Sequence, residues 1–188
     1  MNTFGPYPSM GLVFALAIAG TAVSQTSAEK PDHSDVAFMK QAAENGHAEV
    51  ESGKRALSKA SDPRVREFAQ TMVDDHTRSN QRLKALATKK QVELPERPSL
   101  LQKGKAMLLD TAEGESFDRR YAESMGVNAR RDTLELFQNA ASEAQDPEVK
   151  AFAQEALPML QKHLSMAQSL HAALSGSDAR GERERRTR

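Results

Sequence analysis

The sequence predicts an all-α protein in which four long helices form two duplicated helical hairpins. The first observation is an internal repeat, because the pattern Asp-Pro-x-Val-x-x-Phe-Ala-Gln occurs at residues 62–70 and again at 146–154. In each copy the Asp can cap the free amides of a first helical turn, and the Pro suits the first helical position. The second observation is that a long segment with apolar residues at helical spacing lies on both sides of each copy. Each repeat therefore marks the turn of a hairpin.

Residues 1–24 contain no charged side chain, and Gly11–Val23 is a continuous run of apolar and small residues. This run is short for a bilayer span and is typical of the apolar part of a signal peptide, although no Lys or Arg precedes it. We therefore predict a signal peptide over residues 1–24, with an uncleaved anchor as the alternative. Residues 25–34 are polar, contain a proline and are predicted to be a linker.

The folded domain is predicted to cover residues 35–174. Its helices are expected over residues 35–60, 63–90, 116–144 and 147–174. Pro95 and Pro98 interrupt the chain between the second and third helices, and the leucine-rich residues 100–109 suggest a short additional helix there. Two tight turns separated by a long crossover connection are typical of a ferritin-like four-helix bundle. Residues 175–188 are predicted to be a disordered, Arg-rich tail.

Composition excludes several classes of function. The 26 basic and 26 acidic residues give a formal net charge of zero, so the charge of the chain as a whole gives no electrostatic preference for nucleic acid or for an anionic membrane. The absence of cysteine removes disulfides and thiol chemistry, and no nucleophile motif or phosphate-binding glycine loop occurs. We therefore expect a protein that is not an enzyme, with an envelope partner or a small ligand that the sequence does not identify. Binding through the Arg-rich tail is a weaker alternative.

Helical periodicity places four polar side chains on the inward faces of the helices, near the middle of the bundle. They are Glu49, His76, Asp132 and His163. A shift of 83 residues places Glu49 on Asp132, so the two carboxylates are expected at equivalent positions of the two hairpins. Two imidazoles with one or two carboxylates would suit a single zinc or non-haem iron ion.

A carboxylate-bridged di-iron centre is not indicated, because such a centre pairs each histidine with a Glu three residues earlier. Val73 and Leu160 occupy those positions here. A buried network in which histidines and carboxylates satisfy one another accounts for the same residues. The sequence therefore predicts this network without a cofactor, and a single iron or zinc ion is the alternative.

Four stretches resemble a bacterial family of exported proteins, the domain of unknown function 4142 family, often labelled predicted outer membrane proteins. The stretches are Ala-Glu-Val-Glu-Ser-Gly at 48–53, Phe-Ala-Gln-Thr-Met-Val-Asp-Asp-His-Thr at 68–77, Phe-Asp-Arg-Arg-Tyr at 117–121 and Leu-Pro-x-Leu-x-x-His-Leu at 157–164. The resemblance implies export and a ferritin-like helical fold. The resemblance does not imply any particular substrate. Where other members carry a histidine in the third helix, this chain has Ala129, which weakens the metal alternative.

Together these observations predict an exported bacterial protein of the periplasm, with outer-membrane association as the alternative location. Its expected role is that of a non-enzymatic binding or stress-related factor. The competing role is metal binding by His76 and His163 with Glu49 or Asp132. No transmembrane span is expected once the signal peptide is removed.

Overall fold

The computed structural model describes residues 30–124 and 127–186, without the side chains of residues 124, 127–128 and 177–186. Every regular element in these residues is a helix, which confirms the predicted all-α class. The helices are α1 (His33–Lys59), α2 (Pro63–Lys89), α3 (Leu100–Asp110), α4 (Gly114–Ser124), α5 (Val127–Glu143) and α6 (Pro147–Arg186). Within this part of the chain, no helix combines the length and apolarity that crossing a membrane requires.

The repeated Asp-Pro pairs begin α2 and α6 as predicted. Asp62 accepts a hydrogen bond from the backbone N–H of Arg64 at 2.7 Å. Asp146 accepts from the N–H groups of Glu148 and Val149 at 2.8 and 3.1 Å. Each carboxylate thus satisfies amides that lack a partner within the helix, so both turns end where the sequence indicates.

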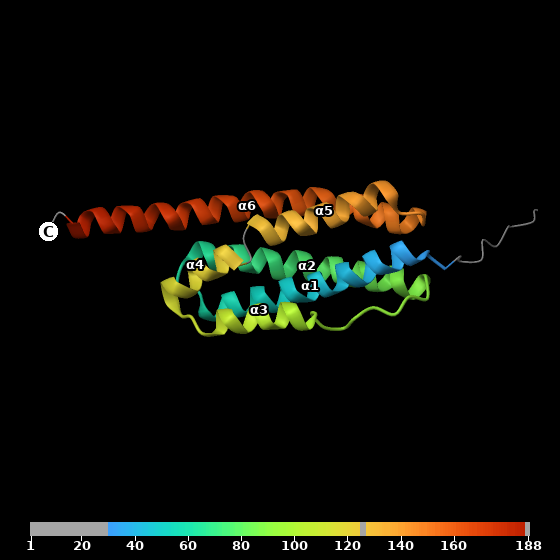
Figure 1. Ribbon diagram of the computed structural model, residues 1–188, viewed down its shortest axis with the longest axis horizontal. Helices are drawn as coiled ribbons and strands as arrows, with labels where there is room; N and C mark the ends of the chain where they lie inside the picture. Colours follow the sequence, from blue (N-terminus) through green and yellow to red (C-terminus); the bar gives the residue numbers. More distant parts are fainter. Residues whose placement is uncertain (1–29, 125–126, 187–188) are drawn as a thin grey trace, which may run out of the picture.

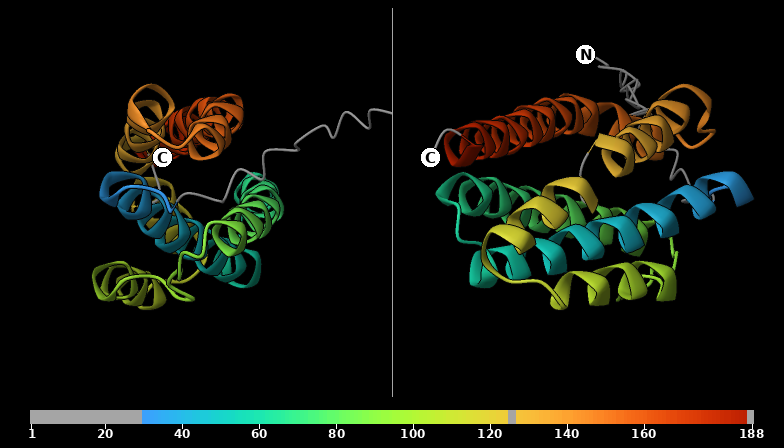
Figure 2. Two further views of the ribbon diagram at one scale, coloured as in Figure 1. Left: turned by 90° about the vertical axis from the view of Figure 1, so that its right-hand side faces the viewer. Right: turned by 60° about the vertical axis from the view of Figure 1, so that its left-hand side comes forward.

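The helices form two antiparallel pairs, α1 with α2 and α5 with α6, which pack against each other (Figure 1). Between them the chain runs through α3, which lies along α1, and α4, which leads into α5. Both further views agree that α3 occupies the side of the molecule opposite α5 and α6 (Figure 2). The long connection between the hairpins therefore covers an outer face.

The apolar core consists of two clusters, one toward each end of the bundle. The first includes Leu83 and three phenylalanines, Phe38, Phe137 and Phe152, whose rings contact one another. The second cluster includes large side chains from α2, α4 and α6: Val65, Phe68, Met72, Phe117, Tyr121 and Leu170. On α1, α2 and α6, residues of the polar centre described below lie between the two clusters.

Two buried carboxylates join the hairpins at their turns. Asp118 of α4 accepts hydrogen bonds from both backbone N–H groups of residues 61–62, at distances of 2.9 to 3.2 Å. Asp35 of α1 does the same for residues 145–146, with bonds as short as 2.7 Å. The repeat shift of 83 residues relates Asp35 to Asp118. Each hairpin therefore completes the turn of the other.

The third predicted helix differs from the structure. Instead of one helix over 116–144, the chain has α4 and α5, and residues 125–126 lie outside the described part. The inward face of α5 is set by Arg130 and Phe137, which are 4% and 5% exposed, and continues through Ala140. Asp132, predicted to point inward, is exposed. The prediction was wrong because it extended the helical phase of Phe117 and Tyr121 across a boundary between two helices.

The last helix is also longer than predicted. α6 continues to Arg186, whereas the sequence analysis ended the helix at Leu174 and treated residues 175–188 as a disordered tail. The segment after Leu174 contains no proline and is rich in Arg and Glu, which favour helix. In Figure 1 this part of α6 projects beyond the other helices. The predicted signal peptide at residues 1–24 and the first half of the linker at 25–34 lie outside the described residues.

Candidate functional site

Polar side chains from α1, α2, α5 and α6 meet between the two apolar clusters. We call Glu49, Asp75, His76, Arg130 and His163 the central polar cluster. Four of them are almost inaccessible, because Glu49, His76, Arg130 and His163 are 8%, 6%, 4% and 0% exposed. Three of the four predicted site residues, Glu49, His76 and His163, thus come together as expected. The fourth predicted residue, Asp132, does not join them.

Glu49 and Arg130 form a buried ion pair, with the Arg130 Nη2 atom 3.1 Å from the Glu49 Oε2 atom. The guanidinium also lies over the ring of Phe68, 4.9 Å from its centroid. Burial is the largest single influence on Glu49 and opposes its ionisation, but the charge and hydrogen bond of Arg130 together with the nearby His76 and His163 outweigh it, so the pKa of this carboxyl lies below its ordinary value. The pair carries one negative and one positive charge into the core.

His163 is held in position by Asp75. Its Nε2 atom lies 2.9 Å from the Asp75 Oδ2 atom, and Asp75 also pairs with Arg78. Burial would raise the pKa of Asp75, but the bond to His163 and the charges of His163 and Arg78 lower it. An ionised Asp75 accepts a hydrogen bond from the Nε2–H group of His163, which leaves the lone pair of the neutral ring on Nδ1. That Nδ1 atom is buried and has no hydrogen-bond partner among the described residues.

His76 lies beside His163, with ring centroids 5.2 Å apart and ring planes at 47°. Its Nε2 atom is likewise buried, and the described part of the chain offers it no hydrogen-bond partner. Burial lowers the pKa of His76 to about 4 and also lowers the pKa of His163. Both rings are therefore neutral at pH 7. Two neutral imidazoles each present an unsatisfied nitrogen within one buried site.

Two hollows adjoin the cluster. A small cavity of about 10 Å³ lies beside His76 and is lined on the α6 side by Met159 and Leu160. A larger cleft of about 550 Å³ lies between α1, α3 and α5, and both Glu49 and Asp132 line it. Ala129, where the family resemblance implied a histidine in other members, lines the same cleft. Asp132 therefore belongs to the outer cleft, while Glu49 connects this cleft to the buried cluster.

The central polar cluster offers few donor atoms to a metal ion. Within the described residues, no three His, Asp or Glu side chains converge as metal ligands. Glu49 is already engaged by Arg130, so the donors left are the histidine nitrogens and the thioether of Met159 beside His76. This donor set fits a soft ion of low coordination number better than the iron or zinc ion that was the alternative to a cofactor-free network in the sequence analysis.

Two residues of the central polar cluster, Arg130 and Asp75, were not among the predicted site residues. Arg130 lies seven residues before Phe137, the spacing of one helical face, but the assumed phase of the third helix hid this relation. Asp75 directly precedes His76 in the sequence and reaches His163 of α6. Contacts between helices could not be read from the periodicity of one helix.

The chain belongs to the family described as domain of unknown function (DUF4142), whose model matches residues 20–170. This confirms the resemblance noted from the four sequence stretches. No curated protein matches the chain by sequence.

Two solved structures share the fold. One is CopM in the Cu(II)-bound form, with a TM-score of 0.62 at 16% identity, covering 74% of this chain and 96% of that one. The other is CopM in the Ag-bound form obtained by soaking, with a TM-score of 0.61 at 16% identity, covering 74% of this chain and 95% of that one. At this identity the likeness shows a common helical fold.

Proposed function

We propose that this DUF4142 protein is an exported, non-enzymatic protein of the bacterial envelope that binds one soft metal ion, Cu(I) or Ag(I), between His76 and His163. The observation that carries the proposal is the pair of buried, unpartnered nitrogens in adjacent rings, His76 Nε2 and His163 Nδ1. A buried polar atom without a partner costs about 1–3 kcal/mol, so two in one site call for a ligand. A metal ion bound to both nitrogens would give each of them its missing partner.

The charges of the cluster favour a monovalent ion. Arg130 neutralises Glu49, and Arg78 accompanies Asp75, so the cluster is close to neutral when the two histidines are uncharged. The guanidinium of Arg130 stays positively charged, and a divalent ion would place two further positive charges near it. Cu(I) and Ag(I) accept neutral nitrogen and thioether donors, and Met159 lies on the wall of the cavity beside His76. Of the two solved structures of similar fold, one holds silver and the other holds divalent Cu(II), so they support copper or silver as the metal, and the choice of a monovalent ion depends on the charges of the cluster.

Asp75 has a supporting role in this proposal. Metal-binding histidines usually donate their second ring N–H to a carboxylate, which fixes the tautomer and the orientation of the ring. The 2.9 Å contact between Asp75 and His163 is of this kind and leaves the lone pair on Nδ1, which is buried.

A binding role is favoured over catalysis because the cavity beside His76 holds only about 10 Å³, roughly one water molecule. An organic substrate would not reach the histidines. Export is supported by the apolar residues 11–23, and a ferritin-like connectivity by the long connection through α3 and α4. Export and the ferritin-like connectivity are both parts of the proposal.

The test is metal binding by the purified protein under anaerobic, reducing conditions. Cu(I) is titrated in competition with a chelator of known affinity, and bound copper is measured by elemental analysis. We expect about one ion per chain, and its loss in His76→Gln and in His163→Gln. His171→Gln is the matched control, because His171 is an exposed histidine on the same helix as His163. Far-UV circular dichroism verifies that each variant is folded.

Absence of bound Cu(I), or an equal loss in the His171→Gln control, would refute the proposal. Stoichiometric Zn²⁺ in preference to Cu(I) would refute the choice of a soft ion and return the site to the iron or zinc alternative.

A further inference from the structure

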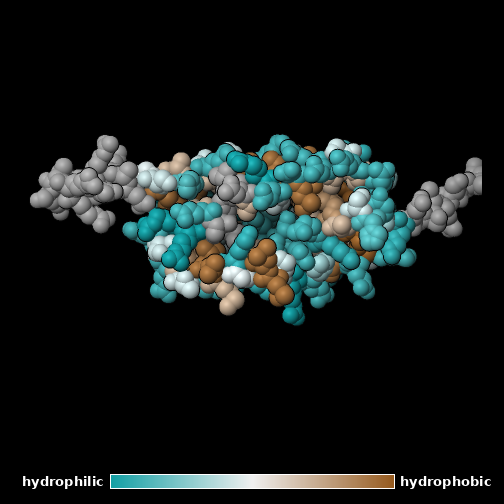
Figure 3. All heavy atoms as spheres, in the orientation of Figure 1, coloured by the Kyte–Doolittle hydropathy of each residue, from teal (hydrophilic) through white to brown (hydrophobic). Residues whose placement is uncertain are grey.

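The short helix α3 presents apolar side chains to solvent. Leu100, Leu101, Met107 and Leu108 are 87%, 71%, 67% and 69% exposed, and they are the large apolar residues that stand out on the described surface. Figure 3 shows hydrophobic side chains grouped along the lower edge of the molecule, where α3 lies in Figure 1. Single exposed leucines are ordinary, whereas four on one short helix form a patch.

These side chains share one face of α3. At 100° per residue, positions 100, 101, 104, 107 and 108 fall within an arc of about 120°. Gly104 lies in the middle of this arc, and a Cβ placed there would meet nothing within 4 Å. Ala106 and Leu109 lie on the opposite side and are buried. The helix is thus apolar on both faces, and only one of them is used by the fold.

Polar contacts at both ends fix this orientation. At the start of α3, Ser99 and Gln102 form a capping box, and the Gln102 amide donates to Asn45 of α1 at 2.8 Å. At its end, Arg55 pairs with the Asp110 carboxylate at 3.3 Å, and Lys59 donates to the Asp110 carbonyl at 2.8 Å. Turning the leucines inward would break these contacts, so the apolar face points outward in the folded protein.

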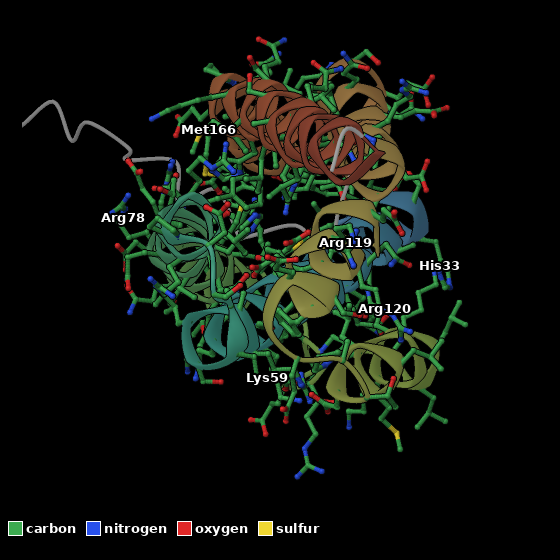
Figure 4. All side chains as sticks on the ribbon, turned by 90° about the vertical axis from the view of Figure 1, so that its left-hand side faces the viewer. His33, Lys59, Arg78, Arg119, Arg120 and Met166 are labelled. Atoms are coloured by element: carbon green, nitrogen blue, oxygen red, sulfur yellow. The ribbon has the colours of Figure 1, made fainter. Side chains whose placement is uncertain are left out.

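Positive charges border the apolar face. Lys103 and Lys105 lie on its two edges, about 100° to either side of its centre. The chain has no acidic residue between Leu100 and Leu109, and Asp110 is paired with Arg55 and Lys59. Arg120 donates to Thr111 just beyond α3, and Figure 4 shows Lys59 and Arg120 beside this helix.

We propose that α3 docks in the plane of an anionic lipid bilayer, with its leucine face in the headgroup region and its lysines against lipid phosphates. An apolar stripe flanked by lysines is the pattern of helices that lie in a membrane interface. The position of α3 suits this contact, because it forms the outermost element on one side and runs along the long axis of the molecule (Figures 1 and 2). A flat surface can reach α3 without displacing another helix. The proposal does not depend on metal binding.

A second copy of the chain suits this face less well. Two α3 helices packed face to face would bring lysines opposite lysines, with no acidic side chain on either face to pair with them. Stable interfaces also use about 20–30 residues on each side, many more than one short helix offers. Charge complementarity therefore selects an anionic surface over an identical one.

The test is flotation of the purified protein with vesicles of phosphatidylglycerol and phosphatidylethanolamine, compared with phosphatidylcholine alone. We expect binding to the anionic vesicles that weakens as salt is raised. Leu101→Gln/Leu108→Gln should lower the partition coefficient at least tenfold. Since each lysine near an anionic surface contributes about fivefold, Lys103→Glu/Lys105→Glu should lower it about 25-fold or more. Because every variant has the same N-terminal segment, differences between variants report on α3.

The matched control for charge is Lys40→Glu/Lys162→Glu, which makes the same charge change at two exposed lysines on α1 and α6. A second measurement uses the absence of tryptophan from the chain. Met107→Trp should show a blue-shifted emission with anionic vesicles, whereas Ala172→Trp on α6 should not. These substitutions are at exposed positions, so the fold is expected to be kept.

Unchanged binding in the leucine variant, or an equal loss in the Lys40→Glu/Lys162→Glu control, would overturn the proposal. So would a protein that ignores vesicles but forms a concentration-dependent dimer that Leu101→Gln/Leu108→Gln abolishes, which would assign the face to a second copy.

Discussion

Replacing Arg130 with methionine removes the only guanidinium that contacts Glu49 within the described residues and keeps most of the apolar volume of the side chain. Glu49 then remains as a buried carboxylate without a counter-ion. At an effective dielectric constant of about 20, two charges 3.1 Å apart attract each other by about 5 kcal/mol. Breaking a buried pair by removing one partner typically destabilises a protein by about 3–5 kcal/mol. We expect a loss in this range for Arg130→Met.

The double variant Glu49→Leu/Arg130→Met separates the charge effect from lost packing. Exchanging a whole buried pair for apolar residues is often neutral, so the double variant should be at least about 2 kcal/mol more stable than Arg130→Met alone. It will not fully recover, because the contact of Arg130 with the ring of Phe68 is also lost, and such contacts contribute up to about 2 kcal/mol.

The assay is equilibrium unfolding in urea at pH 7.5, followed by far-UV circular dichroism on metal-free protein. The wild type, both single variants and the double variant complete the cycle. The reasoning is refuted if Arg130→Met lies within about 1 kcal/mol of the wild type, or if the double variant shows the sum of the two single losses.

Three further predictions concern the same core. For metal-free protein, burial lowers the pKa of His76 to about 4 in the folded state, against 6.5 when unfolded, so the unfolded chain binds more protons between these pH values. The free energy of unfolding should therefore fall by up to about 3 kcal/mol as the pH is lowered through this window. In urea titrations, His76→Gln should flatten this pH dependence. Asp75→Asn should weaken Cu(I) binding about 10–100-fold in the chelator competition while leaving an apo melting temperature close to that of wild type, and unchanged affinity would contradict the supporting role of Asp75. Asp118→Asn should destabilise the protein by about 1–3 kcal/mol, because one of its oxygens becomes a donor facing the N–H groups of residues 61–62, whereas the exposed Asp74→Asn should change the unfolding midpoint little.

Much of the fold follows from local chemistry that the sequence displays. The Asp-Pro pairs at 62–63 and 146–147 locate both turns, since a cap and its proline act within a few residues. The grouping of Glu49, His76 and His163 follows from periodicity along α1, α2 and α6, which are continuous through the site. The sequence was therefore sufficient wherever a single helix carries the helical phase from a turn to the site.

The remaining features depend on contacts between elements. Asp132 was placed inward because the third helix was assumed to be continuous, and the boundary between α4 and α5 brings Arg130 inward instead. Because Glu49 is paired with Arg130, the groups that remain available in the site are neutral imidazoles and not free carboxylates. Helical periodicity does not show such a change, because it depends on which side chain of a neighbouring helix meets the carboxylate.

The reciprocal carboxylates Asp35 and Asp118 suggest how the chain would behave if it were divided. A fragment containing only α1 and α2 carries a turn at 61–62 that lacks its carboxylate and an Asp35 that lacks its turn. Two copies of that fragment could satisfy each other, because Asp35 occupies the place in its hairpin that Asp118 occupies in the other. The half-length chain is therefore expected to assemble as a symmetric pair, and the intact protein resembles such a pair joined into one polypeptide.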